Sequence, residues 1–331
     1  MRTSHAWIAT YAVTGALQPL LVDRLKQQGL APARLLGPMM ANLIGMTWVA
    51  PAREACVGSP APIAQTIRAS WRPLAAAAAL DFGSAALLCV GLLYAGAAAF
   101  TLVYASCAPL VSAIGAAAGA QIRREQWVAI ALATLGLALD GLACKSEGKA
   151  AADARLWGSL LAFLGSVGHS GMFVMAEHAL ENKSAKAAGL TPFRLSSCMG
   201  FAETTVLATF VALQVTYDAE RMTTVAVAYA PLILIDGLHA LSFFATLGER
   251  GAVSAAMLKG VQVVFVFVAS SVLSCDTESG AGCATPAKAA GVAIVVAGLA
   301  LFYAKEPPRL RGASASGDDG EELLPTRSTV T

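Results

Sequence analysis

Ten stretches of this sequence consist almost entirely of apolar residues, and each is close to the length that crosses a lipid bilayer. A helix needs about 20 such residues to span the hydrocarbon layer. Backbone groups inside that layer must be hydrogen-bonded within the segment, which an α-helix achieves. We therefore predict an all-α integral membrane protein with ten transmembrane helices, over residues 6–22, 36–50, 74–93, 97–121, 127–143, 157–177, 197–216, 225–247, 251–274 and 287–304.

The overall composition supports this prediction. Of the 331 residues, 56% are hydrophobic and only 13% are charged, whereas soluble proteins contain about 25% charged residues. The net charge of +2 gives no reason to expect a nucleic-acid partner. No Cys/His spacing suggests a metal site, and we expect no cofactor.

A short internal repeat divides the chain into two halves. The sequence "TLGLAL" (134–139) ends the fifth predicted span, and "VAGLAL" (296–301) ends the tenth. Five spans per half give the halves opposite orientations, an arrangement typical of secondary transporters. We predict one five-helix repeat over 1–145, a second over 155–304, and a disordered cytosolic tail over 305–331, which is rich in Pro, Ser, Gly and acidic residues.

The distribution of Lys and Arg predicts the orientation. The connections on the N-terminal side hold more of these residues than those on the opposite side, which places both termini in the cytosol. The loop with Cys275 and Cys283 would then face an oxidising compartment, and the sequence leaves open whether they form a disulfide.

Ionisable residues inside the predicted spans are the strongest functional signal, because such groups usually face a cavity or a partner. Counting from the cytosolic ends at 1.5 Å per residue, four of them share one layer: Asp81, Glu203, His239 and Lys259. Asp236 lies one helical turn deeper than His239 on the same face.

The helix face around Lys259 is small and polar, with Ala255, Ala256 and Gln262 at helical spacing from it. This pattern is typical of a helix that lines an aqueous cavity, where an ammonium attracts phosphate as a point charge. The alternative is a structural ion pair of Lys259 with Glu203 or Asp81. For His239, the alternative is a hydrogen-bonded core histidine.

Several segments resemble nucleotide-sugar transporters of the drug/metabolite transporter superfamily. "MLKGVQVVFVFVASSVLS" (257–274) resembles the ninth helix of that family, with its Lys-Gly pair, and "AAAFTLVYASCAPLVSAIGAAAGAQIRREQW" (97–127) resembles its fourth helix. "GMFVMAEHAL" (171–180) and "TPFRLSSCMG" (191–200) resemble the end of helix six and the entry to helix seven. The resemblance implies that Lys259 contacts nucleotide phosphates and that Tyr104 lines the central cavity.

We thus expect a secondary transporter, not an enzyme, that exchanges nucleotide-sugars or a related phosphorylated metabolite across a Golgi or other endomembrane by alternating access. Gln18 and Gln262 would line the path with Tyr104, while Glu203, Asp81 and Asp236 would set the charge and position of Lys259. The expected partners are a small anionic metabolite, the lipid bilayer and, as a possibility, a second copy of the chain. The alternatives are a proton-coupled exporter that uses Asp81, Glu203 and His239, or a non-transporting scaffold or receptor.

Overall fold

A computed structural model describes residues 2–30, 36–58, 62–142, 149–214, 219–273 and 286–304. Within these ranges the chain is helical and contains no strand, as the apolar pattern predicts. The predicted tail, together with Cys275 and Cys283, lies outside the described residues.

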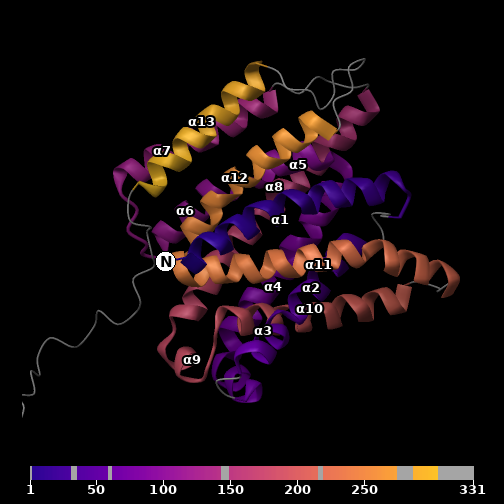
Figure 1. Ribbon diagram of the computed structural model, residues 1–331, viewed down its shortest axis with the longest axis vertical. Coiled ribbons are helices and arrows are strands. Elements are labelled where there is room, and N and C mark those ends of the chain that lie inside the picture. The colour runs from indigo at the N-terminus through magenta and orange to yellow at the C-terminus, as the bar shows by residue number, and fades with distance from the viewer. Residues whose placement is uncertain are drawn as a thin grey trace, which may run out of the picture.

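Thirteen helices form one elongated bundle, and most of them run across the view of Figure 1 side by side. Their bounds are α1 Arg2–Gln27, α2 Gly37–Thr47, α3 Val49–Val57, α4 Ile63–Ala95, α5 Ala97–Tyr104, α6 Cys107–Ala117, α7 Arg124–Leu142, α8 Lys149–Glu181, α9 Lys183–Ala187, α10 Pro192–Gln214, α11 Ala219–Arg250, α12 Ala252–Leu273 and α13 Pro286–Tyr303. The described part of each predicted range is therefore mostly helical.

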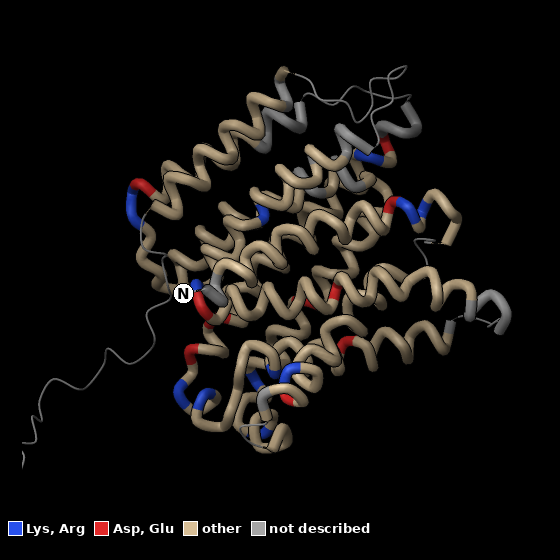
Figure 2. The backbone as a smooth tube through the Cα atoms, viewed as in Figure 1, with Lys and Arg blue, Asp and Glu red and all other residues tan. Residues whose placement is uncertain are grey.

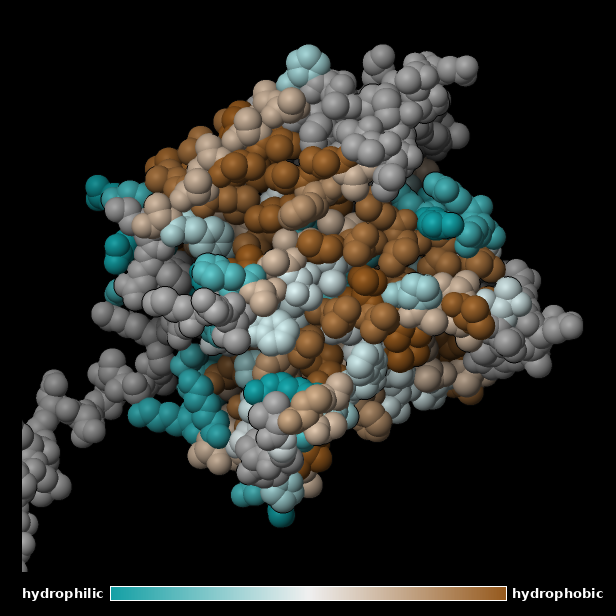
Figure 3. All heavy atoms as spheres, viewed as in Figure 1, coloured by the Kyte–Doolittle hydropathy of each residue, from teal (hydrophilic) through white to brown (hydrophobic). Residues whose placement is uncertain are grey.

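The helices and the surface of the bundle are compatible with insertion in a membrane. Four helical segments are long and apolar enough to cross a bilayer: Ile63–Ala95, Asp153–Glu181, Pro192–Leu213 and Thr224–Arg250. Large apolar side chains such as Trp157, Phe201 and Leu213 remain 64–79% exposed, and apolar atoms cover most of the visible face of the helices (Figure 3). Charged residues gather toward the helix ends, with few along their middles (Figure 2).

Two of the predicted ranges are each interrupted by a break. The range 36–50 contains the junction of α2 and α3 at Trp48, and the range 97–121 contains the junction of α5 and α6 after Tyr104. Pro51 and Pro109 are each the third residue of the helix that follows the break. Proline lacks the N–H that would continue the preceding helix, but the first turn of a new helix tolerates it.

Helix α8 begins before the predicted start of the second five-helix repeat at residue 155. Helix α8 starts at Lys149, inside the connector predicted between 145 and 155. Its first turns read "KAAADARL" (149–156), and residues such as Ala, Lys, Arg and Leu are good helix formers even outside the apolar core. The helix therefore extends N-terminal to the predicted span 157–177.

Close helix pairs use glycine at their contacts. Helices α7 and α13 pack along each other, and so do α4 and α8. On α7, a Cβ built on Gly136 would lie 2.6 Å from the carbonyl oxygen of Gly291; on α13, one built on Gly298 would lie 2.8 Å from that of Ala129. Only glycine permits backbones to approach this closely, as is common between membrane helices.

Candidate functional site

A cavity whose mostly apolar lining carries several polar side chains lies in the interior of the bundle, between helices α1, α2, α4, α5, α8, α11 and α12. Its volume, taken as the space open to the centres of water molecules, is about 170 Å³. Seven of the eight residues that the sequence proposes for a site line it: Gln18, Asp81, Tyr104, Asp236, His239, Lys259 and Gln262. Residues chosen by their depth and face in the predicted spans and, for Tyr104, by resemblance thus come together around one cavity.

Lys259 is the cation of this cavity, and it is 4% exposed. Its Nζ donates a hydrogen bond to the hydroxyl of Tyr104 at 3.1 Å. The same atom lies 4.3 Å from the centroid of the Tyr104 ring and 5.3 Å from that of Tyr11, distances at which aromatic faces attract an ammonium. Within the described residues, neither Glu203 nor Asp81 lies within 4.0 Å of Nζ, so the ion pair considered as an alternative is not formed here.

Helix α1 contributes Gly15 and Gln18 to the cavity lining, and Tyr11 and Thr14 lie on the same helix face, at helical spacing from them. Gln262 donates a hydrogen bond to the backbone oxygen of Tyr11 at 3.1 Å. A Cβ on Gly15 would lie 2.2 Å from the Gln262 amide, so only glycine leaves room for that side chain. Tyr11 was missed from the sequence, although its spacing from Gln18 could have identified it.

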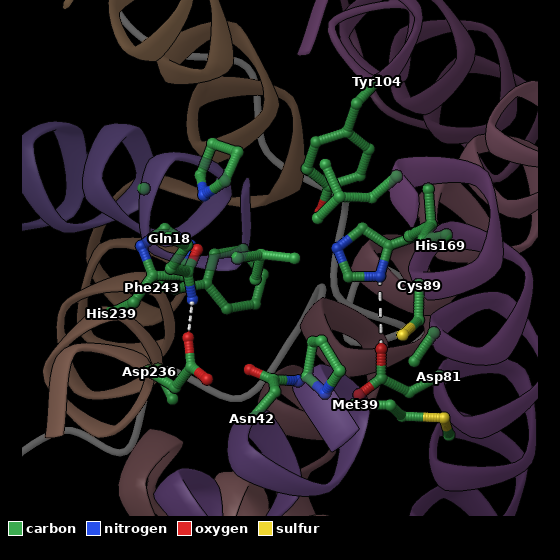
Figure 4. A pocket seen from close by; sticks show the side chains of 18 of the residues that line it. Gln18, Met39, Asn42, Asp81, Cys89, Tyr104, His169, Asp236, His239 and Phe243 are labelled. Carbon is green, nitrogen blue, oxygen red and sulfur yellow. Dashed lines mark hydrogen bonds and ion pairs between the residues drawn. The ribbon is translucent and has the colours of Figure 1, made fainter. Parts of the chain in front are cut away.

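Two aspartates occupy separate walls of the cavity (Figure 4). Asp81 of α4 lies within hydrogen-bonding distance of His169 of α8, with 3.2 Å between Oδ1 and Nδ1. Asp236 of α11 accepts a hydrogen bond from the Gln18 amide at 2.6 Å. Asp81 thus has an ionisable partner that can become a cation, whereas the described partner of Asp236 is a neutral amide.

The two histidines are hydrogen-bonded and also line the cavity. His239 Nδ1 lies 3.0 Å from the Thr14 hydroxyl, and its ring stacks on Tyr11 with centroids 4.7 Å apart. His169 contacts the ring of Tyr104 at 5.5 Å as well as Asp81. The alternative of a core histidine and the assignment to a site therefore do not exclude each other.

Glu203 is the one proposed residue that the structure does not bring to the cavity. It lies on α10, which packs behind α2, α4 and α11 and contributes no cavity residue. The side chain is buried, at 2% exposed, and both carboxyl oxygens lack a hydrogen-bond partner among the described residues. Counting depth along a helix could not reveal this, because depth does not say which way a helix face points.

The cavity extends toward one end of the bundle and stops short of the other. Its lining includes Pro38 at the start of α2 and Leu92 near the end of α4. At the opposite end, Arg194 of α10 is fully buried and donates to Glu54 of α3 at 2.6 Å and to Thr66 of α4 at 3.0 Å. This cluster closes that end by joining the two halves of the chain.

No metal site is evident in the part of the chain that the structure describes, where no three His, Cys, Asp or Glu side chains gather as ligands. Cys89 and Cys107 are buried free thiols. Cys89 lines the cavity, while the Cys107 thiol lies 3.7 Å from the backbone oxygen of Ser166. What the cavity offers a solute is therefore hydrogen bonds, aromatic faces and fixed charges.

Comparisons with known proteins bear on the fold. No protein-family model matches this chain, and no curated protein matches it. Among solved structures, 23 chains match. One of them, a crystal structure described only as that of a protein, shares 16% identity and a TM-score of 0.57 over 91% of this chain and 96% of its own. At this identity the similarity concerns the fold alone.

Proposed function

We propose that this protein is a secondary transporter that moves a small anionic metabolite across a membrane by alternating access. The observation that supports this most is Lys259, a buried ammonium that faces a cavity inside an apolar bundle, with no carboxylate of the described residues within 4.0 Å of it. A scaffold does not need polar groups gathered around a cavity inside the bundle. A buried cation is costly inside a membrane protein, and it usually marks a pathway for a solute or ion.

We further propose ten spans in two inverted repeats, as the sequence predicts. In this reading α2 with α3 and α5 with α6 each form one broken span, and the other spans are α1, α4, α7, α8, α10, α11, α12 and α13. Discontinuous helices next to the substrate are common in such transporters, and Tyr104 lies at the break between α5 and α6.

A constant spacing between the halves supports the repeat. The same interval of 155 positions separates three pairs of residues: Gly96 and Gly251, Asp81 and Asp236, Tyr104 and Lys259. The two glycines each have a positive φ, of 78° and 83°, and each connects a long helix to the helix that borders the cavity.

The helix contacts support the repeat as well. Exchanging each span for its counterpart turns the pair α4–α8 into the pair α11–α1, and both pairs pack extensively. It leaves the pair α7–α13 unchanged, where Gly136 and Gly298 make matching contacts in "TLGLAL" and "VAGLAL". In a true inverted repeat the contacts of one half recur in the other, whereas unrelated halves would show no such correspondence.

The cavity shape supports alternating access. It extends toward the end of the bundle at which α1 and α4 finish, and the Arg194–Glu54 pair joins the halves at the other end. Opening that closed end while closing the present opening would carry a solute across. We place the protein in an endomembrane such as that of the Golgi. Both termini then face the cytosol, in keeping with the Lys and Arg distribution.

The resemblance favours nucleotide-sugars or a related phosphorylated metabolite, and the size of the cavity bears on this choice. Pockets for drug-sized ligands measure about 300–1,000 Å³, and this cavity measures about 170 Å³. A nucleotide-sugar would need the cavity to widen, whereas a compact phosphate or carboxylate would not.

A proton-coupled exporter is the second candidate. The contact between Asp81 and His169 and the buried, unpartnered carboxyl group of Glu203 favour it. Uptake that is unchanged by an imposed pH gradient would remove this candidate and leave simple exchange.

The test measures thermal stability and liposome uptake for purified protein with nucleotides, nucleotide-sugars, sugar phosphates and uncharged metabolites. We expect stabilisation and uptake with solutes that carry a phosphate, lost in Lys259→Gln. Lys186→Gln is the matched control, because Lys186 is an exposed lysine on α9, away from the cavity. Equal responses in Lys259→Gln and the wild type would refute the role of Lys259, and a response to uncharged solutes alone would refute the anionic class.

A further inference from the structure

The cavity has two charged poles, and they do not neutralise each other. Lys259 has no carboxylate within 4.0 Å, and Asp236 has no cationic group within that distance, among the residues that the structure describes. Asp81 differs from Asp236, because it contacts His169. His169 is a countercharge for Asp81 only when its ring is protonated. The amine of Lys259 and the carboxyl group of Asp236 are thus two cavity groups without any ion-pair partner among the described residues.

The two poles lie at different heights along α1. Lys259 approaches the ring of Tyr11, and Asp236 contacts the amide of Gln18, seven residues further on. Seven residues span two helical turns, or roughly 10 Å along the axis. A solute that reaches both poles therefore needs its two charged groups a short chain apart.

The need to balance charge inside the loaded cavity limits which solutes can bind. Burying a charge without a partner is unfavourable, and removing water from the loaded cavity makes it more so. An anion alone would neutralise Lys259 and leave Asp236 without a countercharge, while a cation alone would do the reverse. A solute with both charges satisfies both poles and adds no net charge to the cavity.

Resting on the proposed transport function, we propose that the solute is bipolar: its anionic group binds Lys259 and its amine binds Asp236. The anion receives an ammonium hydrogen bond beside the Tyr104 hydroxyl. The amine donates to Asp236, whose other hydrogen bond comes from Gln18. The class is compact amine-bearing phosphates and carboxylates whose charges are separated by a short chain, in agreement with the modest cavity volume.

The experiment uses two matched sets of probes with the full-length protein in detergent and in liposomes. One set is phosphoethanolamine, ethyl phosphate and ethylamine; the other is 4-aminobutanoate, butanoate and butylamine. We expect the bipolar member of one set to bind about tenfold or more tightly than either single-charge analogue, because each lost charged hydrogen bond costs about that factor or more. The set that responds distinguishes a phosphate from a carboxylate solute.

Variants assign each pole. Asp236→Asn should remove the advantage of the bipolar probe over its anionic analogue, and Lys259→Gln should remove its advantage over the amine. Asp153→Asn is the matched control, since Asp153 is exposed near the start of α8. The comparison between probes needs only the wild-type protein, so it stands even if Asp236→Asn does not fold.

The outcomes separate this inference from the proposed function. If the anionic analogue binds as well as the bipolar probe and depends on Lys259, the transporter of anions stands and the bipolar solute is wrong. If the anionic analogue gains affinity on acidification until it equals the bipolar probe, a proton neutralises Asp236 and the inference is also wrong. If no probe of either set binds, while uncharged metabolites do, the proposed function fails as well.

Discussion

The ion pair that closes one end of the bundle should be a large, measurable contribution to stability. Arg194 is fully buried, and its side chain donates to Glu54 at 2.6 Å, to Thr66 at 3.0 Å and to the backbone oxygen of Gly189 at 3.4 Å. Glu54 is 23% exposed at its side chain, so water solvates it in part. The perturbation is to neutralise each partner separately, as Arg194→Gln and Glu54→Gln.

Removing one partner of a buried ion pair costs about 3–5 kcal/mol, and the partial exposure of Glu54 favours the lower value. In a chain of this size 1 kcal/mol changes the melting temperature by about 2 °C. We therefore expect each variant to melt about 6 °C or more below the wild type. Glu54→Gln should be the more severe of the two, because it removes the carboxylate that the fully buried guanidinium contacts, whereas Arg194→Gln leaves a carboxylate that water solvates in part.

The assay is thermal unfolding of the purified protein in detergent, with the double variant included. The two substitutions should be non-additive by about 1.5–3 kcal/mol, because each removes the same interaction. Lys186→Gln is the control: it breaks an ion pair with Glu181 whose side chains are 52% and 31% exposed, and such pairs contribute less than about 1 kcal/mol. Additive effects of Arg194→Gln and Glu54→Gln, or shifts no larger than in Lys186→Gln, would refute the reasoning.

Three further predictions follow from the geometry of the site and of the α7–α13 contact. Tyr104→Phe removes the hydroxyl that Lys259 contacts but keeps the ring, so solute affinity should fall about threefold to tenfold in a binding assay, and less than in Tyr104→Ala. Gly15→Ala should displace Gln262 and weaken solute binding, while Gly83→Ala, with open space around its Cβ, should not. Gly136→Ala and Gly298→Ala should each lower stability by about 1–3 kcal/mol through overpacking, and a melting temperature equal to that of Gly83→Ala would contradict the close contact.

Much of the fold could be predicted from the sequence, because the hydrocarbon layer dictates the length of a span and its apolar character. The breaks in α2–α3 and α5–α6 were not predicted, although Pro51 and Pro109 could have indicated them. Proline is ambiguous from sequence: Pro19, Pro73 and Pro231 lie inside continuous helices. Whether a proline ends a helix depends on the neighbours that hydrogen-bond the freed carbonyl groups.

The site was predicted in part, and the errors have a common cause. Residues on a polar stripe of their own helix, such as Lys259 with Gln262, proved to line the cavity. Glu203 was assigned to the same layer by its depth, but α10 does not border the cavity. Periodicity places a residue along and around its own helix, whereas the rotation of that helix against its neighbours is decided by packing between segments far apart in sequence.

The contacts of Lys259 explain how a bundle so poor in charge retains an ammonium without a carboxylate beside it. Placing a lysine at the centre of a membrane helix costs about 2.5–3.5 kcal/mol on insertion scales. A desolvated cation–π contact stabilises by up to about 2 kcal/mol, and a hydrogen bond from a charged group by about 1.5–3 kcal/mol. The rings of Tyr104 and Tyr11 and the Tyr104 hydroxyl can together offset that cost. Unlike a carboxylate, these groups leave the positive charge uncompensated and two of its three N–H donors available to a solute. Tyr104 and Lys259 hold equivalent positions in the proposed repeat. Because one half carries a tyrosine there and the other a lysine, the cavity has a cationic group on one side, where an anion can bind.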